Sequence, residues 1–355
     1  MTSLSICVDY DDALVAKLIW SSLSKFISHL EESKPVEASL QWSSYESISF
    51  ESILRSVDKL CNSYIFRKAL IRKNFLANTV KFWVAKHPDS TLANSIPKTY
   101  LLECDFADYL EEALNESFEL QHALDLNQLE EEKTRKYFIL KPGMTDRGEG
   151  IRLFSTREEL RQIFEDFDDF EDSDLEDSEE HEKDGVVASQ LRHFVVQEYI
   201  SPPLLLENTR KFHIRAYVVA FGALKVWVWS EMLALFAGMT YLPPSFAHDE
   251  RERHLTNTCL QKGLVTTDSV LRFWSLSLPN EVLEHIYSQI RQITGEIFLA
   301  AAETQQMHFQ VRLLFPYLMR HCQTCSKFSE LTFSWTTITK FICWRLIRYI
   351  LEEIS

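Results

Sequence analysis

The segment from residue 137 to residue 154, YFILKPGMTDRGEGIRLF, places a glycine-containing loop between two short apolar stretches. The first stretch carries Lys141, and the loop contains Gly143, Gly148 and Gly150. Glycine tolerates positive φ and lets backbone N–H groups approach a ligand closely. The pattern predicts a strand, a loop that covers the phosphates of a nucleotide, and a second strand, although most glycine-containing hairpins are only hairpins. It is not a P-loop, because GxxxxGK[ST] does not occur and no helix follows the glycines directly.

Composition excludes several classes of protein. The chain has 355 residues, of which 46% are hydrophobic and 25% charged, as expected for a globular protein with a sizeable core. Its seven cysteines are scattered, odd in number and not preceded by a signal peptide, so we expect reduced thiols and a cytoplasmic location. No run of 18 uncharged apolar residues occurs, which argues against a membrane protein. The short basic stretch 67–73 in an acidic chain argues against a nucleic-acid partner.

The negative charge is concentrated in one segment. The formal net charge is −15, and residues 165–184 alone hold thirteen acidic residues against one lysine. Such a segment is too charged to bury, so we expect a disordered insertion over 165–184. A solvated loop without a partner is the simpler interpretation, and a docking site for a basic partner is the alternative.

The N-terminal part of the chain favours helix. Apolar residues recur at helical spacing over 1–35, and further helix is expected over 46–84, including the basic stretch FRKALIRKN. The lysines of that stretch could simply be solvated, or Lys68 or Lys73 could reach into a ligand cleft. Residues 103–136 also favour helix and are acidic.

The C-terminal half favours strands followed by a helix. FVVQEYI (194–200) predicts a strand, and KFHIRAYVVAFG (211–222) predicts a long one that forms a hairpin through Phe221–Gly222. Residues 271–309 predict helix on both sides of Pro279. This order of elements fits two antiparallel sheets with a nucleotide between them.

These motifs and their order along the chain resemble the tubulin–tyrosine ligase family of ATP-grasp enzymes. The matching text is FRKALIRKN, LKPGMTDRGEGI, VVQEYISPPLLLENTRKFHIRAYVV and HLTNTCLQ, in family order over roughly residues 55 to 309. The resemblance implies an α/β (α+β) fold in which two sheets of an ATP-grasp core sandwich the nucleotide. The implied units are a small N-terminal domain (1–66), a central ATP-grasp domain (67–200), an incomplete C-terminal ATP-grasp domain (201–309) and a divergent tail (310–355).

The resemblance also assigns roles to single residues. ATP phosphates would be contacted by lysines and covered by the glycine loop, as a compact ammonium charge suits phosphate. Residues from the later motifs would contact the adenine, the rest of the nucleotide and the γ-phosphate or acyl-phosphate. The implied phosphate ligands are Lys68, Lys141, Gly148 and Gly150; the adenine pocket would use Gln197, Glu198 and Ile200; Lys211, Thr256 and Asn257 would contact the nucleotide; Arg215 would act in catalysis.

The implied reaction is ATP-dependent ligation of an amino acid to a protein carboxylate through an acyl-phosphate, with tubulin as the family's protein substrate and Mg²⁺ beside the phosphates. Two alternatives stay open. The chain could bind a nucleotide without catalysing, as an interaction protein, or it could be a glutamylase- or glycylase-type ligase that acts on another protein.

Three departures from the family pattern motivate the first alternative. The family commonly carries an aspartate where this chain has His213 in RKFHIR, and a family arginine on the next strand falls at Ala234. A neutral imidazole can still hydrogen-bond, so His213 stays a candidate for the nucleotide site. Beyond Gln310 the chain has no aspartate or asparagine, so the oxygen ligands that Mg²⁺ requires are expected to be missing. The abrupt change in composition suggests a shifted reading frame, a retained intron or a truncated gene model.

Overall fold

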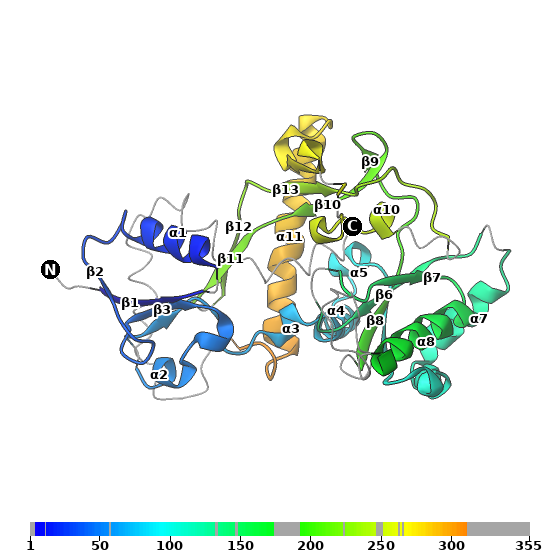
Figure 1. Ribbon diagram of the computed structural model, residues 1–355, viewed down its shortest axis with the longest axis horizontal. Coiled ribbons are helices and arrows are strands. Elements are labelled where there is room, and N and C mark those ends of the chain that lie inside the picture. Colours follow the sequence, from blue (N-terminus) through cyan, green and yellow to red (C-terminus); the bar gives the residue numbers. More distant parts are fainter. Residues whose placement is uncertain are drawn as a thin grey trace.

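The computed structural model describes residues 4–10, 12–56, 58–131, 134–145, 148–173, 192–222, 224–245, 251–261, 263–264 and 266–310. Figure 1 shows a small N-terminal unit at one end, the sheet with the glycine loop at the other, and the long helix α11 (Asn280–Thr304) between them. Helices and several sheets alternate along the chain, so the expected α/β class is confirmed.

The N-terminal unit is a parallel sheet rather than a mostly helical segment. Its strands lie in the order β2-β1-β3-β4 and are β1 (Leu4–Asp9), β2 (Leu30–Glu32), β3 (Leu40–Ser43) and β4 (Leu60–Cys61). Helix α1 (Ala13–Leu23) begins at Asp12, whose side chain accepts from the N–H groups of Leu14 and Val15. The expectation that residues 1–35 are mostly helical was therefore wrong. The spacing of the apolar residues allows helix and strand alike in pieces this short.

The second sheet contains the glycine-loop segment and is antiparallel, in the order β5-β8-β6-β7. Its strands are β5 (Thr99–Glu103), β6 (Phe138–Pro142), β7 (Arg152–Phe154) and β8 (His193–Glu198). Strands β6 and β7 pair directly, which confirms the predicted strand–loop–strand unit. The helices of this part are the 3-10 helix η2 (Ala107–Tyr109), α6 (Leu110–Glu116), α7 (Phe118–Gln128) and α8 (Arg157–Ser173).

Helix α8 corrects the expected start of the acidic insertion. It continues to Ser173, so disorder from residue 165 was a wrong prediction for 165–173, and residues 174–184 lie outside the described part. Phe164 and Phe167 of this stretch are fully buried, and Asp168 accepts from the backbone N–H of Ala107 at 2.8 Å. Two buried phenylalanines anchor the charged turn to the core, and local charge density alone did not reveal them.

The third sheet is antiparallel, in the order β14-β13-β10-β9, with a separate two-stranded hairpin beside it. Its strands are β9 (Leu205–Leu206), β10 (Arg210–Arg215), β13 (Leu233–Phe236) and β14 (Val270–Arg272), and the hairpin consists of β11 (Val218–Phe221) and β12 (Lys225–Val228). The hairpin confirms the turn after Phe221, but the predicted long strand breaks between β10 and β11, because each half pairs with a different partner.

The remaining described elements are short, apart from α4. They are α2 (Phe50–Leu54), α3 (Lys68–Ile71), α4 (Lys73–Lys86), α5 (Leu92–Ser95) and α10 (Arg251–His254), with 3-10 turns η1 (Tyr45–Ser47), η3 (Thr258–Leu260), η4 (Thr267–Ser269) and η5 (Phe273–Ser275). The stretch before Pro279 is β14 and η5, so helix on both sides of that proline was a wrong prediction.

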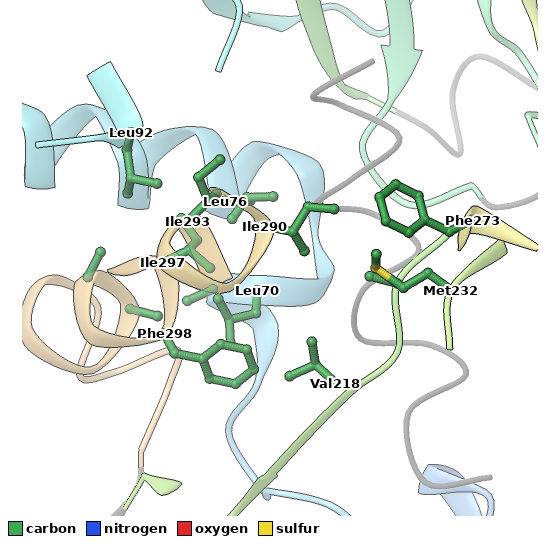
Figure 2. Packing of buried hydrophobic residues seen from close by; sticks show 14 of the residues in the cluster. Leu70, Leu76, Leu92, Val218, Met232, Phe273, Ile290, Ile293, Ile297 and Phe298 are labelled. Carbon is green, nitrogen blue, oxygen red and sulfur yellow. The ribbon is translucent and has the colours of Figure 1, made fainter. Parts of the chain in front are cut away.

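Helix α11 organises the largest core. Figure 2 shows its residues Ile290, Ile293, Ile297 and Phe298 packed near Leu70, Leu76, Val218 and Phe273. Its Glu296 accepts hydrogen bonds from the indole of Trp83 and from the hydroxyls of Ser90 and Thr91, which ties α11 to α4 and α5. In the ranges that the structure describes, no helix has both the length and the apolar character needed to cross a membrane.

Candidate functional site

The main pocket lies between the second and third sheets. About 640 Å³ of space between the atoms lies in it, open solvent included. Strands β6, β8 and β10, helix α4 and the segment after α10 supply its walls. The residues that line it are Lys73, Pro97, Ile139, Lys141, Ile151, Gln197, Glu198, Tyr199, Ile200, Lys211, His254, Leu255, Thr256 and Asn257. Seven of the residues predicted from the sequence are thus brought together: Lys141, Gln197, Glu198, Ile200, Lys211, Thr256 and Asn257.

Three buried lysines dominate the pocket. Lys73, Lys141 and Lys211 are 5–6% exposed and come from α4, β6 and β10. Lys73 donates to the carbonyl oxygens of Pro142 and Thr145 at 2.9 and 2.8 Å, at the start of the glycine loop. Lys141 donates to Oε1 of Gln197 at 2.9 Å. The three ammonium groups therefore surround one cavity.

Lys211 is the most perturbed of the three. Its Nζ donates to the Tyr199 hydroxyl at 3.3 Å and lies 4.4 Å from the centre of the Tyr199 ring. Burial, together with the nearby charge of Lys141, lowers the pKa of Lys211 from 10.5 to about 7. A buried ammonium beside another ammonium is costly unless an anion compensates it. The electrostatics of the pocket therefore favour an anionic ligand.

Tyr199 and His254 are pocket residues that sequence reasoning missed. The Tyr199 hydroxyl lies 3.0 Å from Nδ1 of His254, and burial raises the pKa of Tyr199, so its hydroxyl stays protonated. When Lys211 donates to this oxygen, the tyrosine proton is left to point at Nδ1, which puts the histidine proton on Nε2. Both residues stand inside quoted motifs, VVQEYI and HLTN, so their position in the motifs was the available signal.

The segment Thr256–Asn257 forms part of the pocket wall. Nδ2 of Asn257 is buried and has no hydrogen-bond partner among the described residues, so it is free to serve a ligand. Oγ1 of Thr256 lies 2.6 Å from Nδ1 of His213. His213 is therefore buried behind the pocket wall and reaches the ligand space through Thr256.

The glycine loop requires its glycines here. Gly148 and Gly150 have φ of +84° and +69°, in the left-handed region. A Cβ on Gly148 would lie 2.6 Å from Cδ1 of Leu260 and 3.4 Å from Cγ of Asn257. The loop thus packs directly against the HLTNTCLQ segment, and this contact brings together two motifs that are more than 100 residues apart in the chain.

Besides Gly148, Gly150 and His213, two further predicted site residues lie outside the pocket lining. Lys68 is the exposed first residue of α3, whereas Lys73, the alternative in the same basic stretch, lines the pocket. Arg215 is half-buried at the end of β10, and its catalytic role stays a prediction.

The described residues do not fit a resident Mg²⁺ ion. They contain no group of three or more histidine, cysteine, aspartate or glutamate side chains that could hold a metal ion, and Glu198 is the one carboxylate in the described lining of the pocket. Mg²⁺ requires several oxygen ligands in octahedral geometry. The predicted lack of ligands in 310–355 falls almost wholly outside the described residues and stays a prediction.

Comparison with known proteins supplies an independent context. A model described as the tubulin-tyrosine ligase family matches residues 51–320. A probable tubulin–tyrosine ligase of Schizosaccharomyces pombe is 44% identical over 318 residues, which cover 86% of this chain and 78% of the relative. The probable tubulin–tyrosine ligase PBY1 of Saccharomyces cerevisiae is 42% identical over 287 residues, which cover 75% of this chain and 38% of the relative.

A solved structure gives the fold. The C-terminal domain of K. lactis Pby1, described as an ATP-grasp enzyme interacting with the mRNA decapping enzyme Dcp2, superposes with a TM-score of 0.59 and 30% identity. The match covers 86% of this chain and 78% of that domain. Mouse tubulin polyglutamylase TTLL13 is a more distant relative, 26% identical over 276 residues that cover 74% of this chain and 28% of the relative. The expected ATP-grasp arrangement is thereby confirmed.

Proposed function

Because the chain belongs to the tubulin-tyrosine ligase family, we propose that it binds ATP between its second and third sheets and ligates an amino acid to a protein carboxylate. The observation that carries the proposal is the set of three buried lysines around one pocket, with the pKa of Lys211 lowered to about 7. A polyphosphate supplies negative charge that suits three ammonium groups around one cavity.

Some pocket residues are proposed to contact the phosphates of ATP, and others the adenine. Lys73, Lys141 and Lys211 hold the phosphates, and Nδ2 of Asn257 donates to the same region. The segment Gln197–Ile200 contains the last two residues of β8 and the two residues after it, and it lines the pocket. Its backbone groups can hydrogen-bond to the edge of an adenine. The glycine loop lies over the phosphates through its contact with the HLTN segment.

The proposed reaction has two chemical steps, and neither is assigned to a metal ion. A carboxylate oxygen attacks the terminal phosphorus and ADP leaves. The neutral amino group of the second substrate then attacks the acyl carbon; the C–O bond to the phosphate breaks, inorganic phosphate leaves, and the nitrogen releases one proton as the amide forms. The lysines neutralise the negative charge that develops on the phosphoryl oxygens. Magnesium is implied for the ATP-grasp family, but the described residues offer no ligand set for it, so no step runs through the ion.

The substrates are the finer part of the proposal. Tubulin and an amino acid are proposed from the names of the relatives, which include ligases and polyglutamylases. Dcp2 is a second candidate partner, because the K. lactis protein is described as interacting with it. The cytoplasm is the proposed location. The second candidate function is nucleotide binding without ligase activity. It is favoured by the described residues, whose side chains do not form a set of ligands that fits Mg²⁺.

Two measurements test the proposal. Calorimetric titration of ATP into the purified chain should give binding that Lys73→Ala and Lys141→Ala weaken tenfold or more, as loss of a charged hydrogen bond predicts. Lys68→Ala is the matched control and should bind like the wild type, because Lys68 is exposed outside the pocket.

A ligation assay then separates the two candidate functions. Incorporation of labelled tyrosine, glutamate or glycine into tubulin would support the ligase. ATP binding without incorporation or hydrolysis would support the non-catalytic protein. An ATP affinity that depends on Lys68 and not on Lys73 would contradict the site itself.

A further inference from the structure

Helix α7 carries an apolar stripe on its exposed side. Phe118, His122, Leu126 and Leu129 follow one another at helical spacing of four, four and three residues, so they share one face. Phe118 is 70% exposed, Leu126 52% and Leu129 84%, and the rings of Phe118 and His122 stack at 6.2 Å. We call Phe118, His122, Leu126 and Leu129 the α7 stripe.

The stripe is not part of the core of the chain. The opposite face of α7, with Leu120, Leu124 and Asn127, is the one that is buried. A helix that only covers a sheet needs one apolar face and has a polar face toward solvent. Three large exposed apolar residues on the second face are therefore unnecessary for folding and mark a surface available to a partner.

Acidic residues are frequent in the sequence on both sides of the stripe, and no base lies among them. Residues 105–131 hold nine aspartates and glutamates and no lysine or arginine. Glu119 and Asp125 flank the stripe on α7 and pair with Lys81 and Arg157 from other elements. Five more acids form no ion pair within the described residues: Asp108, Glu112, Glu116, Glu130 and Glu131. The surface is thus apolar along its centre and negative at its border.

The end of the helix adds to this charge. Glu130 and Glu131 follow α7 directly, and its last turn contains no basic residue. The C-terminal end of a helix carries partial negative charge, so acids there are unfavourable and a cation beside them is favourable. A positively charged partner would therefore gain from the acids and from the helix end together.

We propose that the α7 stripe and its acidic border bind an amphipathic helix of another protein, whose apolar face is flanked by lysine and arginine. Helix packing on an exposed apolar stripe is a standard mode of peptide recognition. A second copy of this chain would oppose acids with acids, and an anionic membrane or a nucleic acid would meet the same repulsion. Figure 1 shows α7 on the side of the second sheet away from β10, so a helix bound there leaves the pocket open.

The test uses a defined probe and the full chain. The probe is a fluorescent helical peptide of leucine and lysine at amphipathic spacing, and its control has the same composition in scrambled order. Anisotropy should show saturable binding of the probe and not of the scrambled peptide. Phe118→Gln combined with Leu129→Gln should weaken binding tenfold or more. Leu14→Gln, an equally exposed leucine of α1 in the N-terminal unit, is the matched control and should leave the affinity unchanged.

A charge exchange makes the test specific. Glu130→Lys combined with Glu131→Lys should weaken the lysine probe and improve binding of a probe in which glutamate replaces lysine. Far-ultraviolet circular dichroism checks that every variant keeps its helices. Equal binding of the two peptide orders, insensitivity to the Phe118 and Leu129 substitutions, or no binding at all would overturn the proposal. Sedimentation showing a dimer that depends on Phe118 would also overturn it in favour of self-association.

Discussion

Replacement of Lys211 by methionine should stabilise the ligand-free protein and abolish nucleotide binding. Methionine keeps the length of the side chain and removes a charge that the fold buries at a cost. The pKa of Lys211 falls from 10.5 to about 7, and each unit corresponds to about 1.4 kcal/mol. Subtraction of about 1 kcal/mol for the lost hydrogen bond to Tyr199 leaves a gain of the order of 3 to 4 kcal/mol near pH 6.

The stability difference between Lys211→Met and the wild type should depend on pH. Below pH 7 Lys211 is charged in the folded and in the unfolded chain, so the wild type bears the whole cost of burial. Between pH 7 and 10.5 the folded protein holds the lysine neutral while the unfolded chain keeps it charged, and stability rises with pH. The advantage of Lys211→Met should therefore be largest near pH 6 and shrink as the pH approaches 10.

Urea unfolding of the two proteins at pH 6, 8 and 9.5, without nucleotide, measures the free energy of unfolding directly. ATP titration of the folded proteins supplies the second readout. Lys68→Met, an exposed lysine, is the control and should change neither quantity. A Lys211→Met protein that is less stable than the wild type at pH 6, or an advantage that does not change with pH, would refute the buried-charge argument.

Four further outcomes are expected. ATP binding to the wild type should take up protons near pH 7, because phosphate favours the charged form of Lys211. Above pH 7 the ATP affinity should fall about tenfold per pH unit. Calorimetry in buffers of different ionisation heat measures the proton uptake. Glu296→Gln should cost about 1 to 2 kcal/mol in urea unfolding. Burial raises the pKa of Glu296, but its hydrogen bonds lower it by more, so the pKa in the folded chain lies below 4.5 and the difference should shrink as the pH falls from 4.5 through that lower pKa. Gly148→Ala should weaken ATP binding, measured by titration, through its strained φ and the contact with the HLTN segment. His213→Ala should weaken it as well and His213→Asn less, because the amide can replace Nδ1 toward Thr256.

The choice between two lysines shows why sequence reasoning reached only part of the site. FRKALIRKN offers Lys68 and Lys73, and a continuous helix through the stretch would keep both candidates open. The structure interrupts the helix at Arg72, whose φ of −107° and ψ of 123° are extended. Helix α4 then begins at Lys73 and turns it toward the carbonyl groups of the glycine loop. Helices α3 and α4 both contact α11, and such long-range contacts are not encoded in local propensity.

Short strands were the other source of error. The N-terminal strands are two to six residues long and draw their stability from parallel pairing between distant segments. A pattern of apolar residues this short fits helix as well as strand. Motifs whose residues act through the backbone or through one side chain, such as LKPG and VVQEYI, were predictable because their chemistry is local to the motif.

The pairing of β10 with β13 corrects one comparison made from the sequence. Along β10 the alternation of a strand puts Lys211, His213 and Arg215 on one face and Phe212 and Ile214 on the other, against the core of α11.

Ala234 lies directly opposite Ile214 and is fully buried in the same core. Residues directly opposite each other on paired strands share a face, so an arginine at position 234 would enter the core and not the pocket. The proposed match of the family arginine to Ala234 was therefore wrong. The pocket-side positions of β13 opposite His213 and Arg215 are Leu235 and Leu233. Of these paired strands, β10 alone contributes cations to the pocket side, which is why the binding of a polyphosphate should depend so strongly on Lys211.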